Sequence, residues 1–218
     1  MLHFHPASRH NGWVHGKPIV VTGGAGFIGS HLTDRLLEAG EQVIVVDDLS
    51  AGSRSNLSLA ERNPLFSFRA CKVSECHDLE SLVASAAMVV HLAAVVGVEQ
   101  VMRSPIRTIE TNLSETEVVL AAASHSGTPV LLASTSEVYG KSSQPEFSET
   151  DDLLIGPSTL GRWSYACSKL MDEFLAMAYY REHGVPVRIV RFFNTVGPRQ
   201  TGAYGMVIPR FVDSARAG

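Results

Sequence analysis

Tyr165 and Lys169 are the pair of side chains in this sequence whose types and spacing are best suited to move a proton. On a helix, two residues four apart lie one above the other on the same face. An ammonium group in that position lowers the pKa of a neighbouring phenol, which becomes a base able to take a proton from an alcohol. Tyr-x-x-x-Lys alone occurs by chance, so its meaning depends on whether the chain also binds a hydride acceptor.

A glycine-rich turn near the amino end supplies a place for such an acceptor. The apolar run 17–22 predicts a buried parallel strand, and residues 30–39 have the apolar spacing of a helix. Between them, Gly23 would permit a tight turn, Gly26 would let the backbone approach a pyrophosphate, and Gly29 would let the helix pack closely on the strand. The free N–H groups at the start of the helix would attract the diphosphate.

A second apolar strand, 42–47, ends in Asp47, which follows Gly29 by 18 residues (47 − 29). A carboxylate in this position accepts hydrogen bonds from the hydroxyls of an adenosine ribose. It also repels a 2′-phosphate, so NAD is favoured over NADP. Strand, glycine turn, helix, strand and acid in this order predict an NAD-binding unit.

The rest of the chain keeps alternating strands and helices, which predicts a Rossmann-type α/β fold with a doubly wound parallel sheet. Further strands are expected over 65–69, 88–94, 129–133 and 187–191, and further helices over 78–86, 106–126 and 163–183. Ligands of such sheets bind beyond the carboxyl ends of the strands. We therefore expect Asp47, His91, residues 135–137 and Asn194 to face one site, with His91 a hydrogen-bonded residue at a strand end rather than a catalytic base.

Composition limits the classes of protein to consider. The chain has 218 residues, of which 45% are hydrophobic, and a net charge of −4, so it can bury a large core and gives no reason to expect nucleic acid as a partner. No apolar run approaches the roughly 20 residues that span a membrane. Three cysteines and no apolar signal core favour reduced thiols in the cytoplasm. The irregular histidines of residues 1–16 predict a flexible tail, and no metal site is expected.

Six motifs occur in an order that carries a family resemblance. They are Thr22-Gly-Gly-Ala-Gly-Phe-Ile-Gly29, His91-Leu-Ala-Ala94, Asn112, Ser134-Thr-Ser-Glu-Val-Tyr-Gly140, Tyr165-x-x-x-Lys169 and Arg191-Phe-Phe-Asn-Thr-Val-Gly-Pro198. With them the chain resembles the extended short-chain dehydrogenase/reductases, and within these the nucleotide-sugar epimerase/dehydratase/decarboxylase group. After the tail expected over 1–16 from its composition, the resemblance implies an NAD-binding Rossmann domain with the catalytic residues over 17–200 and the beginning of a truncated substrate-binding portion over 201–218.

The resemblance also implies the roles of individual residues. Tyr165 would be the base, Thr135 would hold the sugar 4-hydroxyl, and Lys169 would bind the nicotinamide ribose. The catalytic set is Thr135, Ser136, Glu137, Tyr165 and Lys169; the cofactor set is Gly23, Gly26, Phe27, Ile28, Gly29, Asp47, Leu92, Ala93, Ala94 and Lys169; the substrate set is Thr135, Asn194 and Arg199. The pair Cys71-Lys72 stands where the family usually has Gly-Asp near the adenine, which puts that contact in question.

The implied reaction is a transient oxidation at sugar C4 of a nucleotide sugar, most often UDP-linked, and the resulting 4-keto sugar has three possible fates. Ser136 is a poor acid, which counts against a 4,6-dehydratase. The run Thr-Ser-Glu resembles UDP-glucuronate decarboxylases and some uronate epimerases, so 4-epimerisation and decarboxylation both stay open. Glu137 has a second interpretation, as a strand-end acid that only orients the backbone. A module that binds NAD without turnover is the alternative to an enzyme.

The helices expected over 106–126 and 163–183 carry apolar residues on more than one face. Similar family members pair such helices into a four-helix contact, which suits a two-fold symmetric homodimer. The other interpretation is that these residues only pack on the sheet.

Overall fold

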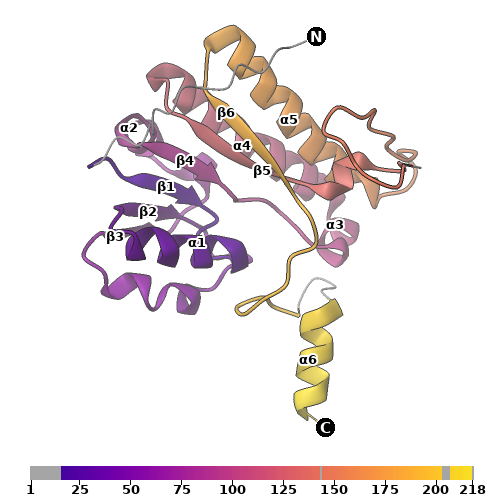
Figure 1. The fold of residues 1–218 in the computed structure, drawn as a ribbon, viewed down its shortest axis with the longest axis horizontal. Coiled ribbons are helices and arrows are strands. Elements are labelled where there is room, and N and C mark those ends of the chain that lie inside the picture. The colour runs from indigo at the N-terminus through magenta and orange to yellow at the C-terminus, as the bar shows by residue number, and fades with distance from the viewer. Residues whose placement is uncertain (1–15, 143, 203–206, 218) are drawn as a thin grey trace.

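The computed structural model of the protein describes residues 16–142, 144–202 and 207–217. Their centre is a six-stranded, wholly parallel sheet in the order β3-β2-β1-β4-β5-β6 (Figure 1). The strands are β1 (Ile19–Thr22), β2 (Val43–Val46), β3 (Phe66–Arg69), β4 (Met88–His91), β5 (Val130–Thr135) and β6 (Val187–Phe192). The predicted doubly wound parallel sheet is confirmed.

The helices are α1 (Phe27–Glu38), α2 (Leu79–Ser85), α3 (Val98–Arg103), α4 (Pro105–Ser126), α5 (Trp163–His183) and α6 (Val207–Ala217). Four short 3₁₀ segments join them: η1 (Arg54–Leu57), η2 (Ala60–Arg62), η3 (Val73–Glu75) and η4 (Ser136–Tyr139). The first helix begins at Phe27 rather than at Ser30, so it starts directly after the glycine turn. Helices α3 and α6 and the 3₁₀ segments were not predicted from the sequence.

The central strands β1, β2 and β4 are largely apolar on both faces because helices cover both faces of the sheet (Figure 1). Val20 and Val46 belong to a core that includes residues of α2 and α4, and Val130 of β5 joins the same core. On the opposite face, Val21 and Val45 pack with residues of α1. This two-sided burial explains why β1, β2 and β4 appear in the sequence as continuous apolar runs, whereas the edge strands β3 and β6 are less buried and include polar residues.

The order of the strands reverses direction between β1 and β4, and in open α/β sheets this switch point is where ligands bind. Thr22 at the end of β1 is paired in register with His91 at the end of β4. The glycine turn and the segment Leu92–Ala94 therefore leave the sheet side by side. A Cβ atom on Gly23, whose φ is +69°, would lie 2.7 Å from the backbone nitrogen of Ala93, so only glycine fits there.

Among the described residues, no helix has the length and apolar character needed to cross a membrane. The predicted tail 1–16 lies, except for Gly16, outside the described residues. The division into a domain over 17–200 and a portion beginning at residue 201 stays a prediction.

Candidate active site

A cavity of about 1570 Å³ opens at the carboxyl ends of the strands, and every residue of the predicted catalytic, cofactor and substrate sets lines it, whereas His91, which was also expected to face the site, does not. The lining residues of these sets are Gly23, Gly26, Phe27, Ile28, Gly29, Asp47, Leu92, Ala93, Ala94, Thr135, Ser136, Glu137, Tyr165, Lys169, Asn194 and Arg199. Sites for small ligands usually measure about 300–1000 Å³. The cavity is therefore large enough for a dinucleotide and a second ligand together.

The glycine turn has the shape that a bound diphosphate requires. The backbone N–H of Gly26 donates to the carbonyl of Gly23 at 3.1 Å, and Gly26 is followed directly by the first turn of α1. The first N–H groups of a helix have no partner within the helix, and both they and Gly26 belong to the lining of the cavity. The first turn of α1 contains no acidic residue that would repel an anion. The residues present thus fit the diphosphate of NAD.

Asp47 is nearly buried and braces this turn. Its Oδ2 accepts a hydrogen bond from the backbone N–H of Ala25 at 2.9 Å, and its Oδ1 accepts one from that of Leu49 at 2.8 Å. Burial raises the pKa of Asp47, and the two backbone hydrogen bonds oppose that rise. The sequence predicted a carboxylate at this edge of the cavity, but not that it also ties the end of β2 to the glycine turn.

Thr135 and Tyr165 face each other across the other half of the cavity. Thr135 is the last residue of β5, and its Oγ1 accepts a hydrogen bond from the backbone N–H of Glu137 at 3.2 Å. Tyr165 lies in the first turn of α5, and a hydrogen bond with the Thr135 side chain lowers the pKa of its phenol. A hydroxyl group bound in this part of the cavity would meet both side chains.

Lys169 is not among the groups that set the pKa of Tyr165 in this arrangement, so the expected lowering of that pKa by Lys169 stays a prediction. Burial raises the pKa of Tyr165 well above its usual value, and the carboxylates of Glu137 and Asp172 raise it further. The ammonium of Lys169 instead donates to Oδ2 of Asp172 at 2.7 Å. The groups around the phenol therefore favour its protonated form.

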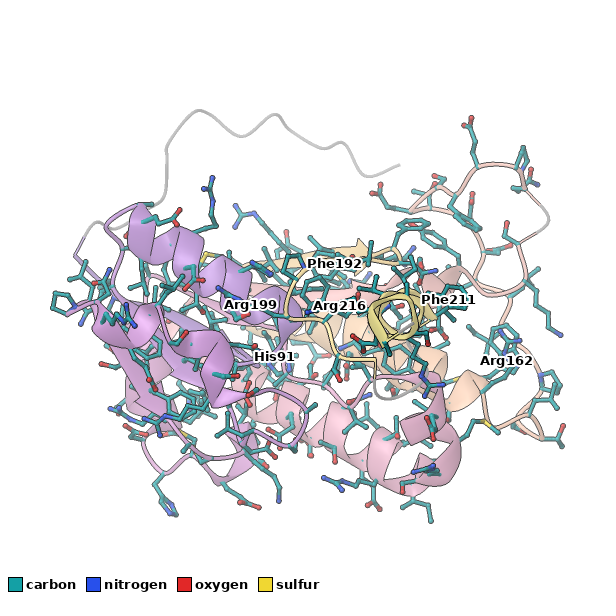
Figure 2. All side chains as sticks on the ribbon, turned by 90° about the horizontal axis from the view of Figure 1, so that it is seen from below. His91, Arg162, Phe192, Arg199, Phe211 and Arg216 are labelled. Carbon is teal, nitrogen blue, oxygen red and sulfur yellow. The ribbon has the colours of Figure 1, made fainter. Side chains whose placement is uncertain are left out.

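Glu137 has a basic neighbour that sequence reasoning missed. Partial burial raises the pKa of Glu137, and the positive charge of Arg162 opposes the rise. Arg162 lines the same cavity and lies on the loop that leads into α5, far from Arg199 beside α1 (Figure 2). Its position three residues before Tyr165 was the only sequence signal for it.

Arg199 lines the cavity, but its charge is already paired. Its Nη2 donates to Oδ2 of Asp34 on α1 at 2.7 Å, and the residue has a positive φ of 67°. The next contact along this segment is between His31 Nε2 and the carbonyl of Pro198 at 2.9 Å. The segment after β6 is thus attached to α1, and Asn194 lies at its start within the cavity lining. The predicted substrate contacts of Asn194 and Arg199 stay predictions.

Cys71 and Lys72 both line the cavity at the end of β3. Lys72 pairs with Glu75 at 2.5 Å, and this contact raises the pKa of its ammonium. The altered adenine contact at Cys71 and Lys72 stays a prediction.

His91 is a fully bonded residue at a strand end, as the sequence predicted. It is 1% exposed, with Nδ1 lying 2.8 Å from Thr22 Oγ1 and Nε2 lying 3.2 Å from Thr116 Oγ1. Burial lowers its pKa to about 3, and the charge of Lys169 acts in the same direction. The imidazole is therefore neutral and positions the end of β4.

A doubly wound sheet with a glycine turn at its switch point and a tyrosine–lysine helix across the cavity defines a dinucleotide-binding protein of the extended short-chain dehydrogenase/reductase class. The chain belongs to the NAD dependent epimerase/dehydratase family, which matches residues 19–218. Membership of this family makes NAD the cofactor.

Individual relatives are enzymes of nucleotide sugars. The UDP-N-acetyl-alpha-D-glucosaminuronate decarboxylase of Bacillus cytotoxicus is 43% identical over 204 residues, which are 93% of this chain and 62% of the relative. UDP-glucuronic acid decarboxylase 1 of Arabidopsis thaliana is 40% identical over 196 residues, 89% of this chain and 43% of the relative. The chain thus spans between about two fifths and three fifths of the length of these relatives.

Two solved structures show the same arrangement. The UDP-N-acetylglucosamine 4-epimerase of Methanobrevibacter ruminantium superposes with a TM-score of 0.84 at 29% identity, covering 93% of this chain and 63% of that one. The UDP-glucuronic acid 4-epimerase of Bacillus cereus, solved with NAD and a fluorinated UDP-glucuronic acid, superposes with a TM-score of 0.81 at 31% identity, covering 92% of this chain and 63% of that one.

Proposed function

We propose that this chain carries the NAD-binding and catalytic part of an enzyme that oxidises C4 of a UDP-linked uronic acid and then decarboxylates it. The observation that carries the proposal is that Thr135, Tyr165 and Lys169 line one cavity with the glycine turn and with Glu137. The decarboxylases among the relatives support a uronate as the substrate.

In the first step, Thr135 accepts or donates a hydrogen bond at the sugar O4, and Tyr165 takes the O4 proton. The glycine turn and Asp47 would hold NAD, which would supply a hydride acceptor and donor at C4, so the overall reaction would need no external oxidant. The buried phenol of Tyr165 loses its proton only with added positive charge nearby. Lys169 keeps N–H donors beyond the one bound to Asp172, and these can stabilise the phenolate.

In the second step, the C5–C6 bond of the 4-keto uronate breaks. Its electron pair flows toward the C4 carbonyl, carbon dioxide leaves, and the resulting enol takes a proton at C5. Glu137 can supply that proton, because its raised pKa keeps it protonated over a wider pH range. Arg162, whose charge acts on Glu137, can bind the carboxylate of the incoming substrate.

The second candidate is 4-epimerisation, in which the keto sugar turns over and receives the hydride on its other face. The structural similarity to the Bacillus cereus UDP-glucuronic acid 4-epimerase favours it. A 4,6-dehydratase is less well supported, since Ser136 is the side chain in the position where an acid would protonate the leaving hydroxyl. The non-enzymatic alternative is an NAD-binding module without turnover.

The products separate these functions. The protein is incubated with NAD and, separately, with UDP-glucuronate and UDP-glucose, and the sugars are followed by NMR. We expect UDP-xylose and carbon dioxide from UDP-glucuronate. UDP-galacturonate or UDP-galactose would instead establish epimerisation. Measurable NAD binding without any product would establish the binding module and refute both enzymes.

The variant Tyr165→Phe tests the assignment of the base. The phenyl ring preserves packing but cannot take a proton, so turnover should fall by roughly 10²–10⁴-fold. The dissociation constant of NAD, measured by calorimetry, should change less than about twofold, because Tyr165 is not in the predicted cofactor set. For scale, a tenfold change corresponds to about 1.4 kcal/mol. Turnover equal to that of the wild type would refute the role of Tyr165.

We further propose that the protein is a homodimer through α4 and α5. Met171 and Phe174 on α5 are 52% and 63% exposed, and Ile106 on α4 is 71% exposed. Large apolar side chains gathered on two adjacent helices indicate a protein contact.

We also propose the cytoplasm as its location, because Cys71, Cys76 and Cys167 are all free thiols.

A further inference from the structure

Helix α5 buries a carboxylate that the proposed reaction does not use. Asp172 is 0% exposed and lies one helical turn beyond Lys169, whose ammonium donates to its Oδ2 at 2.7 Å. The side chain of Asp172 is 0% exposed and that of Lys169 is 3% exposed, so both members of the ion pair are shielded from solvent. A carboxylate is placed in such a position only with a partner, because burial disfavours its charge.

The pairing of Asp172 is incomplete. Its Oδ1 is buried and accepts no hydrogen bond of ordinary geometry from the described residues. Burial raises the pKa of the carboxyl, while the charge of Lys169 and hydrogen bonds with Lys169 and with Thr116 of α4 lower it. A buried acid that bonds firmly through one oxygen is poorly explained as a stabilising element, since the unpaired oxygen costs free energy.

Lys169 connects this buried acid to the cavity. Its side chain is almost wholly enclosed, yet the residue belongs to the cavity lining. An ammonium has three N–H donors, and one of them is bound to Asp172. Binding one N–H fixes the rotation of the ammonium about its Cε–Nζ bond. The other two N–H groups are left for partners in the cavity.

We propose that Asp172 is a positioning residue, whose carboxylate holds the ammonium of Lys169 in the orientation that Tyr165 and the cofactor both need. The proposal rests on the proposed role of Tyr165 as base. It adds a group that touches neither substrate nor cofactor and acts through Lys169.

The charges around Lys169 and Tyr165 come from several elements. The charges of Glu137 of η4 and Asp172 of α5 both raise the pKa of the Tyr165 phenol, and a hydrogen bond with Thr135 of β5 lowers it. Glu173 acts on Asp172 from the next position of the helix. On the far side, Lys169 acts on the neutral His91 at the end of β4. Of these groups, Asp172 is the one bound directly to the ammonium.

Asp172→Asn keeps the size of the side chain and an acceptor oxygen but removes the negative charge. The net positive charge felt by Tyr165 then increases, and its proton is lost at lower pH. We expect the acid limb of the pH–rate profile to move to lower pH by about half to one unit. Asp172→Ala removes the acceptor too, so Lys169 loses its orientation and NAD binds roughly tenfold more weakly.

The closing experiment uses NAD binding, so that it does not depend on turnover. Calorimetric titration with NAD in buffers of different ionisation enthalpy measures the protons released as Tyr165 ionises. The pH at which half a proton is released should fall in Asp172→Asn relative to the wild type. The matched control is Glu173→Gln, which removes the adjacent buried carboxylate, paired with Arg191 rather than with Lys169; its proton release should follow the wild type.

The outcomes separate the two proposals. A shifted proton release in a protein that forms no sugar product supports the role of Asp172 and refutes the proposed enzyme. Identical proton release in Asp172→Asn and the wild type, with unchanged NAD affinity in Asp172→Ala, overturns the role of Asp172 even if UDP-xylose is formed. An equal shift of proton release in Glu173→Gln would also overturn the role of Asp172. It would show that removing any buried carboxylate of α5 has the same effect on the ionisation of Tyr165.

Discussion

At the scale of single residues, burial decides the charge states around the cavity. It raises the pKa of Tyr165, Asp47 and Glu137 and lowers that of His91. In each case the cause is the same, since removing water disfavours the charged form. The protein groups alone therefore hold the phenol of Tyr165 in its protonated state. A positively charged ligand near it would change that state, which couples ligand binding to proton transfer.

His91 should make stability fall in acid. Its pKa is about 3 in the folded protein and has a usual value of 6.5, so the unfolded chain binds a proton that the folded one refuses. The stability that the neutral imidazole contributes to the free energy of unfolding is fully present above pH 6.5. It is lost as the pH falls toward 3, by about 1.4 kcal/mol per pH unit. Urea unfolding at several pH values across this range gives the free energy of unfolding as a function of pH. The slope of that plot should correspond to about one proton fewer in His91→Gln than in the wild type. Equal slopes would contradict the neutral buried imidazole.

At the scale of elements, α5 has an unusual distribution of side chains. It buries Lys169, Asp172 and Glu173 while exposing Phe174 and Met177. The buried polar groups are held by specific partners, among them the Glu173 carboxylate, which binds Arg191 of β6 through both oxygens at 2.8 and 3.0 Å. The helix therefore depends on ion pairs for its packing on the sheet and offers apolar surface to another molecule.

Removing Arg191 should destabilise this packing. Arg191→Ala leaves the carboxylate of Glu173 nearly buried without its cation, which costs roughly 3 kcal/mol of unfolding free energy. The control is Arg188→Ala, an exposed arginine of the same strand, whose effect should stay within about 0.5 kcal/mol. Chemical denaturation measures both. A loss below about 1 kcal/mol for Arg191→Ala would show that the pair contributes little to the contact between β6 and α5.

Phe174 tests the proposed dimer. Phe174→Glu places a charge in the apolar surface of α5 and should convert a dimer into a monomer, since burying an unpaired carboxylate is costly. Light scattering after size-exclusion chromatography gives the mass. Leu59→Glu is the control: Leu59 is 59% exposed, close to the 63% of Phe174, but precedes η2. A monomeric wild type, or a Phe174→Glu variant that stays dimeric, would contradict this interface.

At the scale of the whole molecule, the sheet order places two half-sites on one cavity. The first half holds the glycine turn and Asp47, and the second holds Thr135 and Tyr165. They meet at the switch point between β1 and β4 because the chain returns to the middle of the sheet there. Binding of a dinucleotide would therefore connect elements from both halves and stabilise the whole fold.

This arrangement predicts a preference between cofactors. NAD at about 100 times its dissociation constant should stabilise the protein by about 2.7 kcal/mol, seen as a higher melting temperature. NADP should raise the melting temperature far less, because its 2′-phosphate would meet the carboxylate of Asp47, which is already held by two backbone N–H groups. An equal rise with both cofactors would contradict the proposed contact between Asp47 and the ribose.

Much of the fold could be predicted because local signals and burial agree. The central strands β1, β2 and β4 are largely apolar, so each appears as a short continuous run, and they begin within two residues of their expected positions. The residues of the site were found because they belong to recognisable motifs, some at strand ends and others on helices, as with Tyr165 and Lys169 on α5. Helix α3, the 3₁₀ segments and Arg162 were missed, since they lie in segments whose conformation depends on what they pack against.

The sequence by itself determined the doubly wound sheet, the glycine turn and the presence of Tyr165 and Lys169 on one helix, because these follow from periodicity and spacing along the chain. Only the tertiary structure decided what Lys169 binds. Asp172 is also close in sequence, but the burial that makes their ion pair strong comes from the sheet and from α4. Desolvation depends on every surrounding element, and it is desolvation that raises the pKa of Tyr165 instead of lowering it.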